Sequence, residues 1–268
     1  MSTFGAMWWI DLLRVLVSLS FLSASSWQDY RSREVSNRMW VLFAPTGFAL
    51  TLLKCYLEYT AEKTSFIFLW VFSIAITAGI SLTLFYMGFF GGADAKALMC
   101  LSIAIPTYPE FSSTRFYVLM PIFPLAVLAN AVLASSMLVL VILCYNLIKY
   151  ARLKGALFEG LEHEPLWRKI LVFITGIKID PKKLKSSSHY IPLEYVTKEK
   201  NGEFTRHLKV SPRLEMEDSG ELKIEEFNGE VWVTPGLPFL IFVTGGFVAA
   251  LLFGDFVTWL MNIVLNKI

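Results

Sequence analysis

Long apolar runs separated by short polar links dominate the chain. The runs cover residues 7–27, 39–59, 66–90, 95–105, 117–150 and 238–265. Five of them reach the ~20 residues that a helix needs to cross about 30 Å of hydrocarbon. The run at 95–105 is too short for an ordinary span unless the bilayer thins around it or the helix sits mostly inside the bundle. The pattern predicts an all-α polytopic membrane protein with about six transmembrane helices.

A polar region interrupts this pattern before the last apolar run. Between Lys149 and Pro235 lie 15 of the 24 Lys and Arg residues and 14 of the 22 Asp and Glu residues. Such a charge density is incompatible with hydrocarbon. We therefore divide the chain into a membrane core with five spans at 1–149, a polar insert at 150–235 and a last transmembrane helix at 236–268.

The insert has structure of its own. Its first part carries apolar residues at helical spacing, which predicts an amphipathic helix lying at the membrane surface; these residues are Leu166, Trp167, Ile170, Leu171, Ile174 and Ile177. Further along, the pairs Asn201-Gly202 and Asn228-Gly229 stand between extended runs, and Asn-Gly favours tight hairpin turns. The insert is therefore expected to be small and partly β.

Basic residues in the short loops set the expected orientation, because cytoplasmic loops are enriched in Lys and Arg. With six spans, one side of the membrane collects Arg31, Arg33, Arg38, Lys96, Lys149, Arg152 and Lys154. The opposite loops hold only Lys63 and Arg115. This bias places the insert at the cytoplasmic face and both termini outside.

Composition and single residue types narrow the choice of function. The chain is 55% hydrophobic, above the 45–50% usual for soluble domains, and its net charge of +2 gives no sign of nucleic-acid binding. Three cysteines, Cys55, Cys100 and Cys144, each fall in an apolar run and are expected to be buried core residues. Polar residues interrupt the first apolar run and no small-residue cleavage site follows, so no signal peptide is expected.

Placing a charged side chain within an apolar, membrane-spanning run costs free energy, so each such charge calls for a structural or functional explanation. Asp11 precedes Arg14 by three residues, so both lie on one helix face and can form a local ion pair. Asp255 is expected either to pair with Arg14 or to cap a bend at Gly254. Neither aspartate requires a functional role.

Asp29 and Asp94 differ, because both lie at the predicted cytoplasmic ends of spans and at similar depth. Two carboxylates that approach closely cannot easily both ionise, so one keeps a proton while the other acts as a base. Such a pair can activate water for attack on a peptide carbonyl and protonate the leaving amine. Gly91 and Gly92 permit a tight turn before Asp94. Taken alone, however, Asp94 could simply be the N-cap of the helix that follows.

Other catalytic chemistries find little support. The sequence contains no His-Glu-x-x-His zinc motif, no Gly-x-Ser-x-Gly and no phosphate-binding loop. The histidines His163, His189 and His207 all fall in the polar insert without ligand spacing, and we expect them to be solvated. The sequence therefore predicts no metal and no cofactor.

Two short segments resemble the intramembrane aspartyl proteases with a Gly-x-Gly-Asp motif, and more narrowly the archaeal preflagellin and prepilin-like signal peptidases. "GGADAK" is similar to the motif around the second aspartate, and "QDYRSREVSNRMW" to the region of the first. "EVWVTPGLPFLIF" resembles the entry to the last span in the archaeal branch. The resemblance covers nearly the whole chain, although hydropathy alone supports its middle.

This resemblance implies that Asp29 and Asp94 are catalytic, and that the substrates are the short basic leaders of archaellins and type IV pilin-like proteins, cut at the cytoplasmic face. Ala93 stands where the family motif has Gly. Lys96 is expected either to reach the lipid headgroups or to hold substrate or tune Asp94. Pro235 and Pro238 either expose backbone for a substrate strand or mark an ordinary helix start.

Two other classes of function stay open at this point. The same aspartates could relay protons in a proton-coupled transporter, although no internal repeat typical of transporters is visible. A structural membrane scaffold with incidental charges is the other alternative. The chain lacks both a four-cysteine zinc module and a methyltransferase-like insert, so no N-methylation activity is expected.

Overall fold

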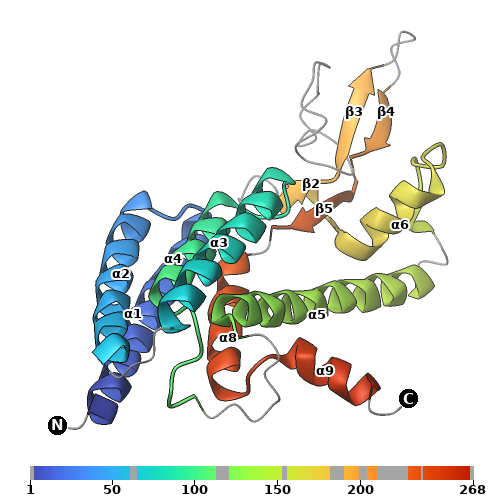
Figure 1. Ribbon diagram of the computed structural model, residues 1–268. Helices are drawn as coiled ribbons and strands as arrows, with labels where there is room; N and C mark the ends of the chain where they lie inside the picture. Colours follow the sequence, from blue (N-terminus) through green and yellow to red (C-terminus); the bar gives the residue numbers. More distant parts are fainter. Residues whose placement is uncertain are drawn as a thin grey trace. The chain divides into compact units, whose positions relative to one another are not determined.

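The computed structural model describes residues 3–60, 65–112, 121–152, 156–181, 190–198, 204–209, 229–236 and 238–265 (Figure 1). The chain divides into two compact units, one formed by Met1–Ser135 with Pro238–Ile268 and the other by Ser136–Leu237. Each unit has its own hydrophobic core.

The first unit is entirely helical in its described part. It contains α1 (Thr3–Ser32), α2 (Asn37–Thr60), α3 (Ser65–Tyr86), α4 (Gly92–Ala104), the first part of α5 (Phe123–Arg152), α8 (Phe239–Leu252) and α9 (Phe256–Leu265). In the described part, α1, α2, α3 and α5 are each long and apolar enough to cross a membrane, and α8 with α9 counts as a fifth span if the bent pair is taken as one. The predicted polytopic helical membrane protein is confirmed.

The short helix α4 lies at the centre of this unit. It contacts α1, α2, α3 and α8, and eight of its 13 residues are buried, among them Leu98 and Leu101. A helix surrounded by protein does not need the length of the bilayer, since its backbone hydrogen bonds are internal and its side chains meet other side chains. Of the two alternatives for this short segment, the structure has the helix that lies inside the bundle.

The predicted last span at 238–265 is not continuous. The axes of α8 and α9 differ by 61° at a short break. Gly254 there has φ +92°, a conformation that favours glycine, and Asp255 accepts a hydrogen bond of 2.9 Å from the N–H of Val257. Asn130 of α5 bonds to both sides of the break, to the carbonyl of Gly254 and the N–H of Phe256. Of the two roles expected for Asp255, the structure has the cap at the bend.

A buried ion cluster joins α1 to α2. Asp11 Oδ1 forms an ion pair of 2.6 Å with Arg14 Nη1, as the sequence predicted. Asp11 Oδ2 forms a second one, of 2.8 Å, with Lys54 Nζ. All three side chains are at most 2% exposed. Arg14 Nε and Thr51 Oγ1 also donate to the carbonyl of Ala104, where α4 ends. The cluster therefore ties three helices together, which is more than the local pair that the spacing indicated.

The cysteines follow the prediction only in part. Cys55 and Cys100 are buried, whereas Cys144 on α5 is exposed at the protein surface. An apolar run indicates that its residues avoid water, but it does not say whether they contact lipid or protein. A residue such as Cys144, on a helix face that no other described part of the protein covers, can be surrounded by lipid and still be exposed at the protein surface.

The second unit mixes helix and strand. It contains the rest of α5, a 3-10 turn η1 (Ala156–Phe158), α6 (Leu166–Thr175), β1 (Ile177–Ile179), β2 (Tyr190–Pro192), β3 (Glu194–Lys198), β4 (Phe204–Leu208) and β5 (Val231–Pro235). β5 pairs antiparallel with β1 and β2, and β3 pairs with β4. Trp232 lies fully buried in a core with Leu157, Leu161, Val172, Leu193 and Leu208. The partly β insert is confirmed.

β3 and β4 pair as the predicted first hairpin, with Lys198 opposite Phe204. The turn of this hairpin, and most of the second predicted hairpin, up to Asn228, lie outside the described residues. The predicted amphipathic helix ends at Thr175, so Ile177 belongs to β1 and pairs with Val233. Gly176, the C-cap residue with extended backbone, separates the two elements.

Candidate active site

Asp29 lies in the last turn of α1 and is half-buried. Its carboxylate accepts a hydrogen bond from the backbone N–H of Leu240, in the first turn of α8, and faces the charge of Arg33. The free N–H groups of a first helical turn and the helix dipole both favour a negative charge at this place. Two helices that are more than 200 residues apart in the chain thus meet at one carboxylate.

Asp94 is the third residue of α4 and is 9% exposed. Its Oδ2 accepts a hydrogen bond of 2.9 Å from the N–H of Gly91, the N-cap residue. This arrangement matches the reaching-back half of a capping box, in which an acidic side chain at the third position satisfies the N-cap N–H. The alternative that Asp94 is itself the N-cap is therefore wrong. The Asp94 carboxylate also lies close enough to Asp29 for the two carboxylates to interact electrostatically.

A pocket of about 380 Å³ lies between the end of α1 and the start of α4. It is lined by Asp29, Arg33, Glu34, Val35, Trp40, Gly91, Gly92, Ala93, Asp94 and Lys96. The two aspartates and the four motif residues named with them, Gly91, Gly92, Ala93 and Lys96, are thus brought together in one place.

Four lining residues were not singled out as site residues beforehand: Arg33, Glu34, Val35 and Trp40. Arg33, Glu34 and Val35 lie in the link between α1 and α2, where Arg33 has φ +60°, and Trp40 lies in the first turn of α2. The length of this link could have indicated these residues, because a link of four residues between two helices must lie close to the helix end that carries Asp29.

Lys96 lies on the exposed side of α4, and its Nζ donates a hydrogen bond of 2.8 Å to Oδ1 of Asn37, the first residue of α2. It thereby ties the start of α2 to the start of α4 at the rim of the pocket. Pro235 ends β5 and Pro238 is the N-cap residue of α8. Neither proline is among the described residues that line the pocket.

The backbone explains how alanine is accommodated at position 93. Ala93 is the second residue of α4, and in the described part of the chain Arg33 is the one non-glycine residue with positive φ. A helical position has no need of glycine. Gly91 differs, because a Cβ placed there would come within 3.0 Å of Oδ2 of Asp94, whereas a Cβ on Gly92 would meet only Phe85 at 3.6 Å.

We predict that Gly91→Ala lowers the turnover of this site about ten- to a hundredfold, because the new methyl group displaces the Asp94 carboxylate and small misplacements of reacting groups are costly. Gly92→Ala is the matched control and should retain most activity, since its methyl group enters ordinary van der Waals contact. Initial rates of peptide cleavage at equal protein amounts check this. Equal losses in the two variants would contradict the role given to Gly91.

Residues 16–144 match the model of the type IV leader peptidase family, and residues 168–256 match the archaeal peptidase A24 C-terminus type II. The first match contains both Asp29 and Asp94.

Two curated relatives align over most of the chain. One is the preflagellin peptidase of Methanococcus voltae, which is 28% identical over 256 residues, covering 91% of this chain and 96% of the relative. The other is the preflagellin peptidase of Methanocaldococcus jannaschii, 24% identical over 253 residues, covering 91% and 95%. The two family models match complementary parts of the sequence and the relatives align with nearly all of it, so the chain is similar over most of its length to the archaeal type IV leader peptidases.

Proposed function

We propose that this chain is a membrane aspartyl endopeptidase that removes the N-terminal leader from archaellin and type IV pilin-like precursors. The observation that carries the proposal is the single pocket lined by Asp29 and Asp94, each at the end of a different helix. The match to a leader peptidase family model and the names of the two relatives support it. The alternative of a proton-coupled transporter has no support from these matches.

The proposed mechanism uses the two carboxylates as a pair that shares one proton. The ionised member takes a proton from a water molecule while that water attacks the carbonyl carbon of the scissile peptide bond. The protonated member donates a hydrogen bond to the carbonyl oxygen, and a proton then passes to the leaving nitrogen as the C–N bond breaks. The N-termini of α4 and α8 stabilise the negative charge of the pair.

The proposed location of this chemistry is the cytoplasmic face of the membrane. Arg33 lies in the loop between α1 and α2, Arg31 in the last turn of α1 and Arg38 in the first turn of α2, and such basic segments between spans are typically cytoplasmic. The pocket lies beside this loop. The leader of a precursor is basic in this family, and Glu34 at the exposed rim of the pocket offers a negative charge to it.

The test is cleavage of defined precursors by membranes that contain the chain. We expect an archaellin precursor to be shortened at its leader, with the new N-terminus identified by mass spectrometry. Running pilin-like and sugar-binding-protein precursors in parallel measures the substrate range. Membranes without the chain are the control, and failure to shorten any precursor would contradict the proposal.

The insert is proposed to contact the lipid surface through α6. Leu166, Trp167 and Ile170 are 76%, 54% and 57% exposed, and the guanidinium of Arg168 lies 5.3 Å from the ring centroid of Trp167. An exposed apolar face with basic residues beside it is typical of helices that lie in the headgroup region of anionic membranes.

We predict that a fluorophore on a cysteine at position 166 is strongly quenched by nitroxide-labelled lipids. The measurement uses the full chain in vesicles, with the exposed Cys144 replaced by serine so that labelling is specific. The same fluorophore on a cysteine at the exposed position Glu159 is the control and should be quenched much less. Equal quenching at the two positions would show that α6 does not insert.

A further inference from the structure

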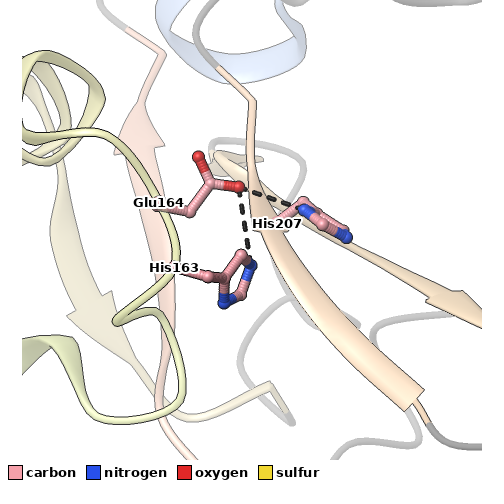
Figure 2. Close-up of side chains that lie close together, drawn as sticks. All are labelled: His163, Glu164 and His207. Carbon is pink, nitrogen blue, oxygen red and sulfur yellow. Dashed lines mark hydrogen bonds and ion pairs between the residues drawn. The ribbon is translucent and has the colours of Figure 1, made fainter.

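Three side chains of the second unit converge at a point that the sequence did not reveal. His163 and Glu164 lie between η1 and α6, and His207 lies in β4, 43 residues after Glu164. One possible ligand atom from each lies within 4.8 Å of the other two. Figure 2 shows both imidazole rings directed at the same carboxylate. The histidines were expected to be solvated, but these two contact a buried acid.

The distances suit a transition metal. Glu164 Oε1 lies 3.1 Å from His207 Nδ1 and 3.8 Å from His163 Nε2. Ligands placed tetrahedrally about 2.0–2.1 Å from Zn²⁺ stand about 3.4 Å apart. These two separations bracket that value, and the third, between the two imidazoles, is within 4.8 Å. His163 has 42% of its side chain exposed and can close the small remaining gap by rotation.

The carboxylate is already held in place. Glu164 is 5% exposed, and its Oε1 accepts a hydrogen bond of 3.1 Å from the N–H of Leu208 while its Oε2 faces Arg168 Nη1 at 3.4 Å. The ring of Tyr195 stacks on His207 at 5.3 Å. Groups that orient ligands in this way raise metal affinity, because the ligands lose less freedom on binding.

We propose that His163, Glu164 and His207 form a site for Zn²⁺ with a fourth position open to water. Two imidazoles and one carboxylate are a known zinc ligand set, whereas Ca²⁺ and Mg²⁺ prefer oxygen ligands alone. The site joins the loop before α6 to β4, so its effect is to stabilise the insert. It is separate from the aspartate pocket, and peptide cleavage does not require it.

The test is Zn²⁺ binding to the full chain, purified in detergent with a tag that contains no histidine and stripped with a chelator. We expect calorimetry and elemental analysis to give one Zn²⁺ per chain, and X-ray absorption to show two imidazole ligands. His163→Ala and Glu164→Gln should each weaken binding at least about tenfold. Glu162→Gln, which changes a neighbouring exposed carboxylate outside the cluster, is the matched control.

The variants are compared at equal folded amount, measured by cleavage of a precursor or, if no precursor is cleaved, by cooperative thermal unfolding. His163→Ala changes an exposed side chain and should keep the fold even if Glu164→Gln does not. Zinc should raise the unfolding temperature of the wild type and of Glu162→Gln but not of His163→Ala. Absence of binding, zinc bound without imidazole ligands, or unchanged affinity in His163→Ala would each overturn the proposal.

Discussion

Asp29→Asn and Asp94→Asn should each reduce cleavage of an archaellin precursor by about a thousandfold or more. An amide of the same shape can neither take a proton from water nor return one to the leaving nitrogen. The fold should persist, since an Asn oxygen at position 94 can still accept the bond from Gly91 N–H. The measurement is the initial rate at equal protein amounts.

Glu34→Gln is the matched control for both variants, because Glu34 lines the same pocket but its exposed carboxylate does not belong to the pair. It should keep most of the turnover and change mainly the KM for a basic leader. Cross-linking of the precursor to the Asn variants tests whether binding survives when chemistry is lost. Cleavage at the wild-type rate by either Asn variant would remove that aspartate from the mechanism.

Asp11→Asn should lower the free energy of unfolding by about 3–5 kcal/mol, the usual cost of removing one partner from a buried ion pair. The change leaves Arg14 and Lys54 as cations that are 1% and 2% exposed, without the carboxylate that both contact. It also weakens the link from Asp11 to the N–H of Glu110, after α4. Thermal unfolding in detergent, followed by circular dichroism, measures the loss.

The double variant Asp11→Asn with Lys54→Met distinguishes lost charge balance from lost packing. Removing the Lys54 cation should recover only part of the stability. Apolar replacements of buried ions are often well tolerated, but Glu58 Oε1, which lies 3.8 Å from Lys54 Nζ, then loses its cation. Glu159→Gln, an exposed change in the insert, should leave unfolding unchanged. An Asp11→Asn protein that melts like the wild type would show that the cluster contributes nothing to stability.

Much of the fold could be predicted because membrane helices are specified by local composition. The predicted runs at 7–27, 39–59 and 66–90 fall inside α1, α2 and, up to Tyr86, α3. The pair of aspartates was also predictable. A carboxylate at the end of an apolar run is costly to place near hydrocarbon, and it can be recognised in the sequence without knowing how the helices pack. Gly91 and Gly92 indicated the turn before Asp94.

What could not be predicted depends on which helix faces meet. Lys54 joins Asp11 because α1 packs on α2, and Asn130 bonds across the break between α8 and α9 from another helix. His207 reaches Glu164 only through the pairing of β3 with β4 and the packing of β4 near α6. None of these contacts has a fixed sequence spacing.

Hydropathy and charge along the chain thus determined the class of protein, its helices and the two aspartates proposed for catalysis. Tertiary structure alone decided that Asp29 and Asp94 share one pocket, that a buried cation pair balances Asp11, and that two histidines converge on Glu164. The reason is physical: burial of a residue in hydrocarbon depends on its own side chain, whereas a site depends on side chains that only the packing of distant segments brings within a few ångströms.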